Sequence, residues 1–449
     1  MSETPAADAW YRHVLADAQP QLSGSDVPWL REMRQQACRD LAQKGFPDRK
    51  QEAWRYSPLG GLLAKHFIPA DSGHDVSLSE FTDELALSGL NSYRLVFVNG
   101  HYSPNLSDQD KLPPGITITD IATLLQDAPD ELAAIYQDYA PQSINGFTAM
   151  HTALSDDGLY IRVAENVQVD RPVEVVFLST PGEQAVTSVP GIVVSLGENA
   201  NLVWLERYQS LGRPFYFQNV VTRVNLESRA SLTHYRIVEE CADAYHLSTI
   251  HVRQHSASRY RAVCMHLKGA WVRSDWHVDL LGEAAQCTLS GGCLIAGQQL
   301  SDIHTQVRHM APACVSDENF KSVVLGAGRM VFDGSIHVAQ QAQYTAATMR
   351  NDNLLLSENA EVDTKPQLEI YADNVKCSHG STVGQMDMEQ LFYLRSRGID
   401  ESRARNLLCQ GFIGEIVQAI TLPELQDHVQ QVLDMAFIAT FSDPATADK

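Results

Sequence analysis

A cysteine and a histidine stand two residues apart toward the C-terminal end of the chain, as Cys377 and His379. They follow the alternating segment Leu368–Ala372, which predicts a β-strand, and residues two apart on a strand share a face. A thiolate and an imidazole are a soft and a borderline ligand for iron, copper or zinc. Two ligands do not close a metal site, so others would come from elsewhere, including another chain. A structural cysteine beside a hydrogen-bonded histidine is the alternative.

Other spacings offer less for chemistry. His251 and His255 could bind zinc on one face of a helix, but this region predicts strands, along which they would lie about 13 Å apart. The chain has no Gly-x-x-x-x-Gly-Lys-Ser/Thr loop, Gly-x-Ser-x-Gly elbow or His-Glu-x-x-His motif. Carbohydrate-acting enzymes use clustered carboxylates. The candidates for such a cluster are Asp275, Asp279, Asp302 and Asp333.

Cysteine usage indicates reduced thiols. Eight cysteines lie scattered between Cys38 and Cys409 without a dense framework. We expect the cysteines in the middle of the chain to be small apolar residues of a core. They are Cys264, Cys287, Cys293 and Cys314. If two of them aligned on neighbouring turns of a coiled sheet, they could relay sulfur along its interior.

The composition is that of an ordinary globular protein and excludes several classes of partner. Of 449 residues, 44% are hydrophobic and 20% are charged, and the formal net charge is −21. Nucleic acids and anionic membrane surfaces attract a basic face, which this balance disfavours. The sequence has no apolar run long enough to span a membrane and no secretory signal over Met1–Asp17. We therefore expect a cytoplasmic protein.

Periodicity divides the chain into three regions. Residues 1–150 predict a mixed, partly helical region, with an amphipathic helix over Pro28–Leu41 that Gly45 ends. Residues 151–384 predict short strands almost throughout. Residues 385–449 predict helices separated by short breaks.

A seven-residue pattern recurs within the strand region. It reads apolar-x-polar-x-small-x-apolar, and the small residue is alanine in five of the six copies. The copies are Val163–Val169, Leu196–Leu202, Leu226–Leu232, Leu281–Cys287, Val338–Tyr344 and Leu356–Val362. Repeated units with a small inward residue suit a coiled sheet, because each turn stacks closely on the next. A β-sandwich or barrel competes, but the scarcity of Asn-Gly hairpin signals favours a parallel β-helix.

The C-terminal region predicts three helices. Gly398 ends the first, and Asp400 can cap the second. The third opens with Thr421–Glu424, a capping box with proline in the first turn, and runs toward Phe441.

Separated segments of the chain, in the same order, match the motifs of one family. They are Gly45–Leu59, Leu95–Gly100, Lys365–Gly384 and Gln390–Ile399. The chain resembles the SufB/SufD family of iron–sulfur cluster assembly proteins, and specifically its SufD type, over most of its length. The resemblance implies a mainly β fold, with a right-handed parallel β-helix core and α-helical regions at the N-terminus and C-terminus.

The resemblance also implies a function and partners. A SufD-type chain is a non-enzymatic scaffold that pairs with the related SufB through the β-helix ends, or forms a homodimer when alone. Each subunit binds the ABC ATPase SufC, which hydrolyses the ATP, and this fits the missing nucleotide loop. The complex builds a transient iron–sulfur cluster at the subunit interface and passes it to apo-proteins. A carbohydrate-acting enzyme on a β-helix is the alternative function.

Two departures from the family pattern identify the SufD type. SufB reads Glu-His-Glu-Ala-Thr where this chain has Ser378–Thr382, and SufB has a cysteine in the segment aligned with Leu355–Pro366, where this chain has none. The resemblance therefore implies that the principal sulfur-accepting thiol lies on the partner. His379 and Cys377 remain as the candidate cluster ligands of this chain.

The resemblance places ATPase docking on the C-terminal helices. Aromatic and arginine side chains often anchor interfaces. The residues that we expect to bind the partner are Tyr393, Leu394, Arg395, Arg397 and Gly398. We expect removal of the residues after Gly384 to abolish docking while the strand region stays folded.

Overall fold

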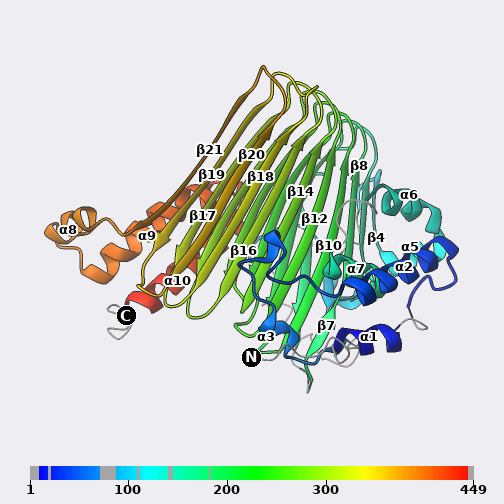
Figure 1. Ribbon diagram of the computed structural model, residues 1–449, viewed down its shortest axis with the longest axis horizontal. Helices are drawn as coiled ribbons and strands as arrows, with labels where there is room; N and C mark the ends of the chain where they lie inside the picture. The colour runs from blue at the N-terminus through cyan, green and yellow to red at the C-terminus, as the bar shows by residue number, and fades with distance from the viewer. Residues whose placement is uncertain are drawn as a thin grey trace.

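The computed structural model describes residues 10–18, 22–70, 87–108, 112–139, 145–180, 182 and 184–442. Its centre is a β-helix of about eight turns, in which the chain winds between two facing sheets (Figure 1). Each central strand pairs in parallel with the strand two places further along the chain, so that Trp271 lies beside Leu300. The predicted mainly β fold with a parallel β-helix is therefore confirmed, and a β-sandwich is excluded.

The strands alternate between the two sheets along the chain. Sheet A contains β1 (Ile68–Pro69), β4 (Ile116–Asp120), β5 (Gly158–Val163), β7 (Val186–Ser188), β8 (Gly191–Leu196), β10 (Tyr216–Leu226), β12 (Tyr245–Gln254), β14 (Trp271–Leu280), β16 (Leu300–His309), β18 (Arg329–Val338) and β20 (Glu361–Ile370). Sheet B contains β2 (Tyr93–Val98), β3 (His101–Tyr102), β6 (Val173–Ser179), β9 (Asn201–Ser210), β11 (Ser231–Glu239), β13 (Arg259–Lys268), β15 (Gln286–Ile295), β17 (Val315–Val324), β19 (Ala346–Leu355) and β21 (Lys376–Gln385). The N-terminal region thus supplies the first strands of both sheets.

The turns of the β-helix explain the seven-residue pattern. Asn199 has a φ of 57° and turns the chain, and the next residue, Ala200, is buried in the core between the sheets. A small side chain suits this place because the next turn of the coil packs directly on it. Ser258 and Cys314 also follow a residue with positive φ and are buried. Their turns escaped the pattern because the flanking residues differ.

Helices of the N-terminal region lie against the outer face of sheet A (Figure 1). They are α1 (Trp10–Ala18), α2 (Pro28–Lys44), α3 (Gly60–Leu63), α5 (Ile121–Asp127), α6 (Pro129–Tyr139) and α7 (Gly146–Leu154), with the short 3₁₀ helix η2 (Glu52–Trp54). A second 3₁₀ helix, η4 (Pro104–Leu106), packs on sheet B instead. Side chains of α1, α2 and α7 share a core with Phe217, Leu247 and Trp271 of the sheet. The predicted N-terminal helix is confirmed, because α2 begins at Pro28 and Gly45, with a φ of 68°, ends it.

The C-terminal region forms the expected helices, and two of them belong to the core. They are α8 (Met388–Ser396), α9 (Glu401–Gln418) and α10 (Pro423–Ser442). Ile413 and Phe437, from α9 and α10, are buried in one cluster with Val263 and Leu294 of sheet B, whereas α8 stands away from the strands (Figure 1). Removing the residues after Gly384 would expose this apolar face of sheet B, so that truncation would not test ATPase docking alone. No helix in the described part of the chain is long and apolar enough to cross a membrane.

Two buried histidines make the fold sensitive to acid. Burial lowers the pKa of His151 to about 3 and the pKa of His309 to about 4. In the unfolded chain both titrate near about 6.5, so below that pH the unfolded chain binds more protons than the folded one. The free energy of unfolding therefore falls as the pH drops from about 6.5 to 4, by about 1.4 kcal/mol per pH unit for each histidine.

We expect His309→Gln to remove one of these two contributions. Glutamine can keep a hydrogen bond to the Ser316 hydroxyl, which His309 Nε2 contacts at 2.9 Å, but it gains no proton in acid. Between pH 7 and pH 4 the wild-type protein should lose about 3 kcal/mol more than the variant, measured by urea unfolding at each pH. Parallel stability curves for the two proteins would contradict this prediction.

Candidate functional site

Cys377 and His379 lie on β21, the last strand of the β-helix and the edge of sheet B. Their register partners on β19 are Ala347 and Met349, which are buried between the sheets. Residues in register on neighbouring parallel strands point to the same face. Both side chains therefore face the interior of the β-helix at its open end, where Cys377 is half-buried and His379 is exposed.

The last turn of the β-helix presents a set of side chains that we call the terminal layer. It consists of the inward-facing residues of β20 and β21: Val362, Thr364, Pro366, Leu368, Ile370, Cys377, His379, Ser381 and Val383. Val362, Leu368 and Cys377 pack on the core beneath, yet Ile370 and Val383 remain 40% and 48% exposed. A chain that covered this end would bury apolar surface around His379.

Beneath the terminal layer lies a buried carboxyl group. A Cβ added at Gly334 would lie 2.5 Å from the Met349 sulfur, so Met349 reaches across the interior to the facing sheet. One strand further in, the register neighbours of Met349 and Gly334 are Glu318 and Thr305. Glu318 is 1% exposed, and among the described residues neither carboxyl oxygen has a hydrogen-bond partner.

The environment of Glu318 favours the protonated form of its side chain. Burial raises the pKa of the Glu318 carboxyl to about 8, the Thr305 hydroxyl opposes this rise in part, and Asp317 adds to it. No motif or spacing in the sequence marks Glu318. The one hint of its burial is that Glu318 alternates with Ser316 and Phe320, which lie on the same face of the strand.

A groove of about 410 Å³ lies on the opposite, outer side of these strands, next to α9. Its charged groups are paired, because Glu415 binds Lys321 at 2.7 Å and Arg350 at 3.2 Å. His379 borders the groove through its main chain, since its side chain faces the interior. The groove is therefore a junction between a helix and a sheet, separate from the terminal layer.

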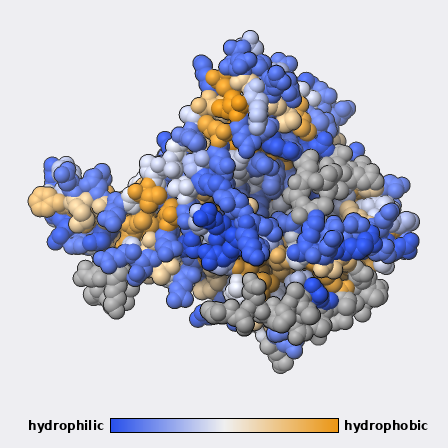
Figure 2. Space-filling view, viewed as in Figure 1, coloured by the Kyte–Doolittle hydropathy of each residue, from blue (hydrophilic) through white to orange (hydrophobic). Residues whose placement is uncertain are grey.

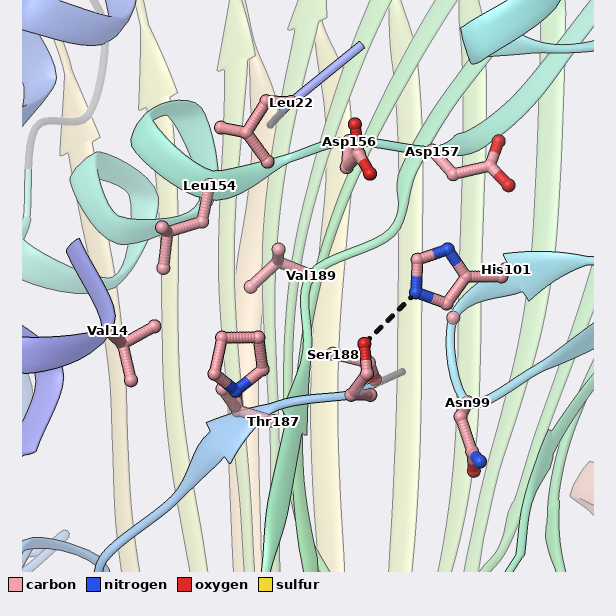
Figure 3. A pocket seen from close by; sticks show the side chains of 13 residues that line it. Val14, Leu22, Asn99, His101, Leu154, Asp156, Asp157, Thr187, Ser188 and Val189 are labelled. Atoms are coloured by element: carbon pink, nitrogen blue, oxygen red, sulfur yellow. Dashed lines mark hydrogen bonds between the residues drawn. The ribbon is translucent and has the colours of Figure 1, made fainter. Parts of the chain in front are cut away.

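A smaller cavity, of about 90 Å³, lies between α7 and the first strands, at the other end of the β-helix (Figure 3). Its polar groups hold main-chain atoms. Asp157 accepts hydrogen bonds from the amides of Tyr102 at 2.8 Å and Gly158 at 2.6 Å. His101 Nε2 lies 3.2 Å from the Ala70 carbonyl oxygen. These contacts join the first strands to the N-terminal region and indicate a structural role, although burial raises the pKa of Asp157 to about 6.

The interior cysteines are core side chains, as predicted, and they do not form the aligned pair that a sulfur relay would need. Cys264 lies opposite Gly291 and Cys293 lies opposite His266, so these two thiols are near each other but are not register partners on adjacent strands. Burial raises the pKa of all four predicted core cysteines, that of Cys293 to about 12. Their thiols therefore stay protonated and poorly nucleophilic.

The structure does not form a zinc site around His251 and His255 in the described part of the chain. His251 stacks on His277, with 4.9 Å between the ring centroids. Burial lowers the pKa of both imidazoles. In the described part of the chain, no group of three or more His, Cys, Asp or Glu side chains could hold a metal ion. A metal at His379 would therefore depend on ligands from another chain.

The aspartates considered for carbohydrate chemistry are bound to cations. Arg273 binds two of them, Asp275 at 2.9 Å and Asp302 at 2.6 Å. The other pairs are Arg308 with Asp279 and Lys365 with Asp333. Carboxylates held in such pairs do not provide the matched acid and base that glycoside hydrolysis needs, so nothing here favours the carbohydrate-acting enzyme.

The N-terminal motif Gly45–Leu59 packs on this charged group. The Arg273 guanidinium lies 3.7 Å from the ring centroid of Trp54, which is buried. Ser57 donates a hydrogen bond to Asp302. The motif therefore joins the N-terminal region to sheet A.

The residues predicted to bind a partner lie on α8 and just after it. Tyr393 is 56% exposed, Leu394 is half-buried, and Arg395 and Arg397 are exposed. Gly398 follows the helix with a φ of 85°. Arg395 pairs with Glu401 at 3.0 Å and so links α8 to α9, whereas the Arg397 guanidinium lies 4.9 Å from the ring centroid of Tyr393 on the same helix.

Two apolar side chains of the same helix, which the sequence does not mark as partner-binding, are also exposed. Phe392 is 73% exposed and Met388 is 63% exposed, whereas Leu391 is the residue that α8 buries. Figure 2 shows hydrophobic residues on this projecting part of the molecule, at the left of the view. The helix has no clear apolar stripe in its sequence, and only its position away from the strands reveals the exposure.

The chain matches two protein-family profiles. Residues 6–175 match the SufBD protein N-terminal region, and residues 177–412 match the SufBD core domain of SUF system FeS cluster assembly. The chain is 32% identical over 425 residues to an iron–sulfur cluster assembly SufBD family protein of Synechocystis, with 92% of each chain covered. It is 33% identical over 397 residues to the iron–sulfur cluster assembly protein SufD of Escherichia coli, with 88% of this chain and 90% of the relative covered. The match to SufD of Bacillus subtilis is 26% over 421 residues, covering 90% and 93%.

The profiles and relatives agree with the fold. The core profile spans β-helix strands and most of α9, and the other profile spans the N-terminal helices and first strands. The chain belongs to the SufBD family of iron–sulfur cluster assembly proteins.

Proposed function

We propose that this chain is a non-catalytic scaffold subunit of a SufBCD-type complex, which assembles iron–sulfur clusters and transfers them to apo-proteins. The terminal layer carries the proposal, because it sets an imidazole and a thiol at the open end of a β-helix. Family membership supports the cluster chemistry. The cluster is the cargo of this site and would form transiently against a partner chain that supplies the remaining ligands.

The partner at the terminal layer would be a SufB-type paralogue. β20 and β21 stand at the ends of their sheets, so each has one edge whose main-chain groups can pair with another chain. Exposed Ile370 and Val383 would add apolar contact beside that edge. When the paralogue is missing, a second copy of this chain would cover the edge as a weaker homodimer.

A SufC-type ABC ATPase would dock on α8. The chain has no nucleotide-binding loop, so ATP hydrolysis would take place on that partner. The free cysteines of the described residues support a reducing compartment, and we place the complex in the cytoplasm.

The test of the paired scaffold is Leu368→Asp. Leu368 is half-buried in the terminal layer, so a carboxylate can stay solvated in the free subunit but would be desolvated in the complex. We expect at least about tenfold weaker binding of the SufB-type paralogue, because an unpaired charge buried at an interface costs about 2 kcal/mol or more. Quantitative pull-down from the source cell measures binding of the paralogue, and size-exclusion chromatography of the isolated variant shows whether it is folded.

The matched control is Leu63→Asp on α3. Leu63 is 40% exposed and lies on a helix of the N-terminal region, away from the terminal layer. This variant should bind the paralogue as tightly as the wild type does. A Leu368 variant that binds the paralogue as tightly as the wild type would count against pairing through the terminal layer.

A further inference from the structure

Glu318 is a buried carboxyl group that the fold does not explain. It stands in a line of register neighbours that runs from Leu289 through Glu318 and Met349 to His379. Leu289 and Met349 are apolar and buried, as suits the interior of a β-helix. Glu318 interrupts this apolar line two strands below His379, where a leucine or methionine would pack without the cost of a polar group.

Neither oxygen of Glu318 has a hydrogen-bond partner among the described residues. The Thr305 hydroxyl faces the same layer of the interior and is near enough to the Glu318 carboxyl to lower its pKa in part, but no hydrogen bond of normal geometry joins the two groups. Buried polar groups are normally paired, and an exception calls for an explanation. Buried carboxyls whose pKa lies near neutrality are common at functional sites.

Few other titratable groups face Glu318. The thiols of Cys287 and Cys293 on β15 point inward. The imidazole of His309 on β16 also points inward and is hydrogen-bonded to Ser316. The inward residues of β18 and β19 are Met330, Phe332, Gly334, Ile336, Val338, Ala347, Met349, Asn351 and Asn353. None of these carries a charge, and Asp317 of β17 points to the outer side. No cation of the described interior thus neutralises Glu318 at this layer.

We propose that Glu318 compensates the charge of a divalent iron ion at the terminal layer, holding its proton while the layer is empty and releasing it when iron(II) binds at His379. The inference rests on the proposed function, which makes His379 an iron ligand. In this step the O–H bond of the carboxyl breaks, its electron pair stays on the carboxylate, and the proton passes to solvent. Iron remains divalent, so no oxidant or reductant is required.

The distance makes the effect measurable. Two strand spacings of about 4.8 Å separate Glu318 from His379 along the line, which gives about 10 Å. A double positive and a single negative charge at this distance attract strongly enough, in an effective dielectric constant of about 25 to 50, to tighten iron binding about 10- to 100-fold. Direct coordination by Glu318 is not needed, and Met349 stays between the two groups.

The test measures anaerobic binding of iron(II) to the full-length protein copurified with its paralogue. We expect Glu318→Gln to bind iron(II) about 10- to 100-fold more weakly than the wild type at pH 7.5. The variant should also release about one proton fewer for each ion bound. Titration calorimetry in buffers with different ionisation enthalpies gives the affinity and the proton count together.

Asp317→Asn is the matched control. It removes a carboxylate one residue away, on the outer side of the strand, where Asp317 accepts a hydrogen bond from Thr348. The affinity should stay close to the wild-type value, and the proton count should fall only slightly, because Asp317 is the smallest of the contributions to the pKa of Glu318. A loss as large as that of Glu318→Gln would mean that net charge alone matters, and it would overturn the inference.

The glutamine variant is expected to fold. The pKa of Glu318 is about 8 in the folded chain and near 4.5 in the unfolded one, so its contribution to stability is lost as the pH rises from 4.5 through 8. At pH 8 the glutamine variant should therefore be no less stable than the wild type. If the variant fails to fold, infrared spectroscopy of the wild type decides, because the band of the protonated carboxyl should disappear when iron(II) is added.

The two proposals fail in different ways. Equal affinity and equal proton release in the wild type and in Glu318→Gln would overturn the inference and leave His379 as the iron ligand. A carboxyl band that persists after iron(II) binds would overturn it too. Unchanged iron(II) binding in His379→Ala would instead overturn the proposed function, and the inference with it.

Discussion

Replacing His379 with alanine is expected to abolish iron–sulfur cluster formation while the complex keeps its subunits. A neutral imidazole can ligate iron, or it can hold a partner thiolate by a hydrogen bond. His379 is exposed in the terminal layer, so the isolated chain should fold without it. Loss of a residue that only supports a ligand lowers metal affinity about 10- to 100-fold. Loss of a direct ligand should lower cluster occupancy by more than that. Visible absorbance of the anaerobically purified complex measures the cluster, and size-exclusion chromatography measures assembly.

Two neighbours of His379 serve as controls. Ser381→Ala changes an exposed residue of the same face and should leave the cluster intact. Cys377→Ser should have a milder effect than His379→Ala, because burial raises the pKa of the half-buried Cys377 thiol and disfavours its thiolate. Full cluster occupancy in His379→Ala would rule out an essential ligand. Loss of the complex itself would assign His379 a structural role at the interface.

The sequence predicts that Cys377 and His379 share a face, but not that they lie on a strand of their own, since the expected strand Leu368–Ala372 overlaps the end of β20 and both residues lie on β21. Their common face follows from the period of a strand alone, which needs no knowledge of the neighbours. The place of Glu318 below His379 was beyond such reasoning. It depends on the register of three strands, in which Glu318 pairs with Met349, thirty-one residues away, and Met349 with His379. An acidic residue in an alternating strand is usually solvated, and only the stacked fold reveals its burial.

Long-range ion pairs also explain why the aspartates could not be interpreted from spacing. Asp275 and Asp302 lie on neighbouring strands and share Arg273, whose guanidinium packs on Trp54 from the N-terminal region. The motif around Trp54 joins the N-terminal region to sheet A through this contact. Its polar half, the bond from Ser57 to Asp302, joins residues 245 positions apart. Periodicity carries no information about such a contact.

The C-terminal helices show the same limit. Asp400 caps α9 as predicted, by accepting a hydrogen bond from the Arg403 amide at 2.9 Å. Leu407 of α9 is 41% exposed, whereas Cys409 and Ile413 of the same helix are buried. An amphipathic stripe says that a helix packs, but it does not name the surface that receives it. That surface is sheet B, and so a test of ATPase docking must leave α9 and α10 in place.

Replacing Phe392 and Tyr393 together with alanine is expected to weaken ATPase binding at least about 30-fold. Both side chains are more than half exposed on α8, a helix that buries Leu391 and projects from the strands. Aromatic anchors at interface centres cost about 2 kcal/mol or more when truncated, which corresponds to about 30-fold in affinity. Surface plasmon resonance with the purified SufC-type ATPase measures the change, and unchanged urea unfolding shows that the fold is retained.

The control for this prediction is Met435→Ala on α10. Met435 is 63% exposed, which is comparable to Phe392 and Tyr393, but it lies on a helix whose other face is fixed to sheet B. If the ATPase recognises α8, this variant should bind as the wild type does. A larger loss from Met435→Ala than from the double variant would move the docking surface to α10. In that case the main role of Arg395 would be its ion pair with Glu401, which links the end of α8 to α9.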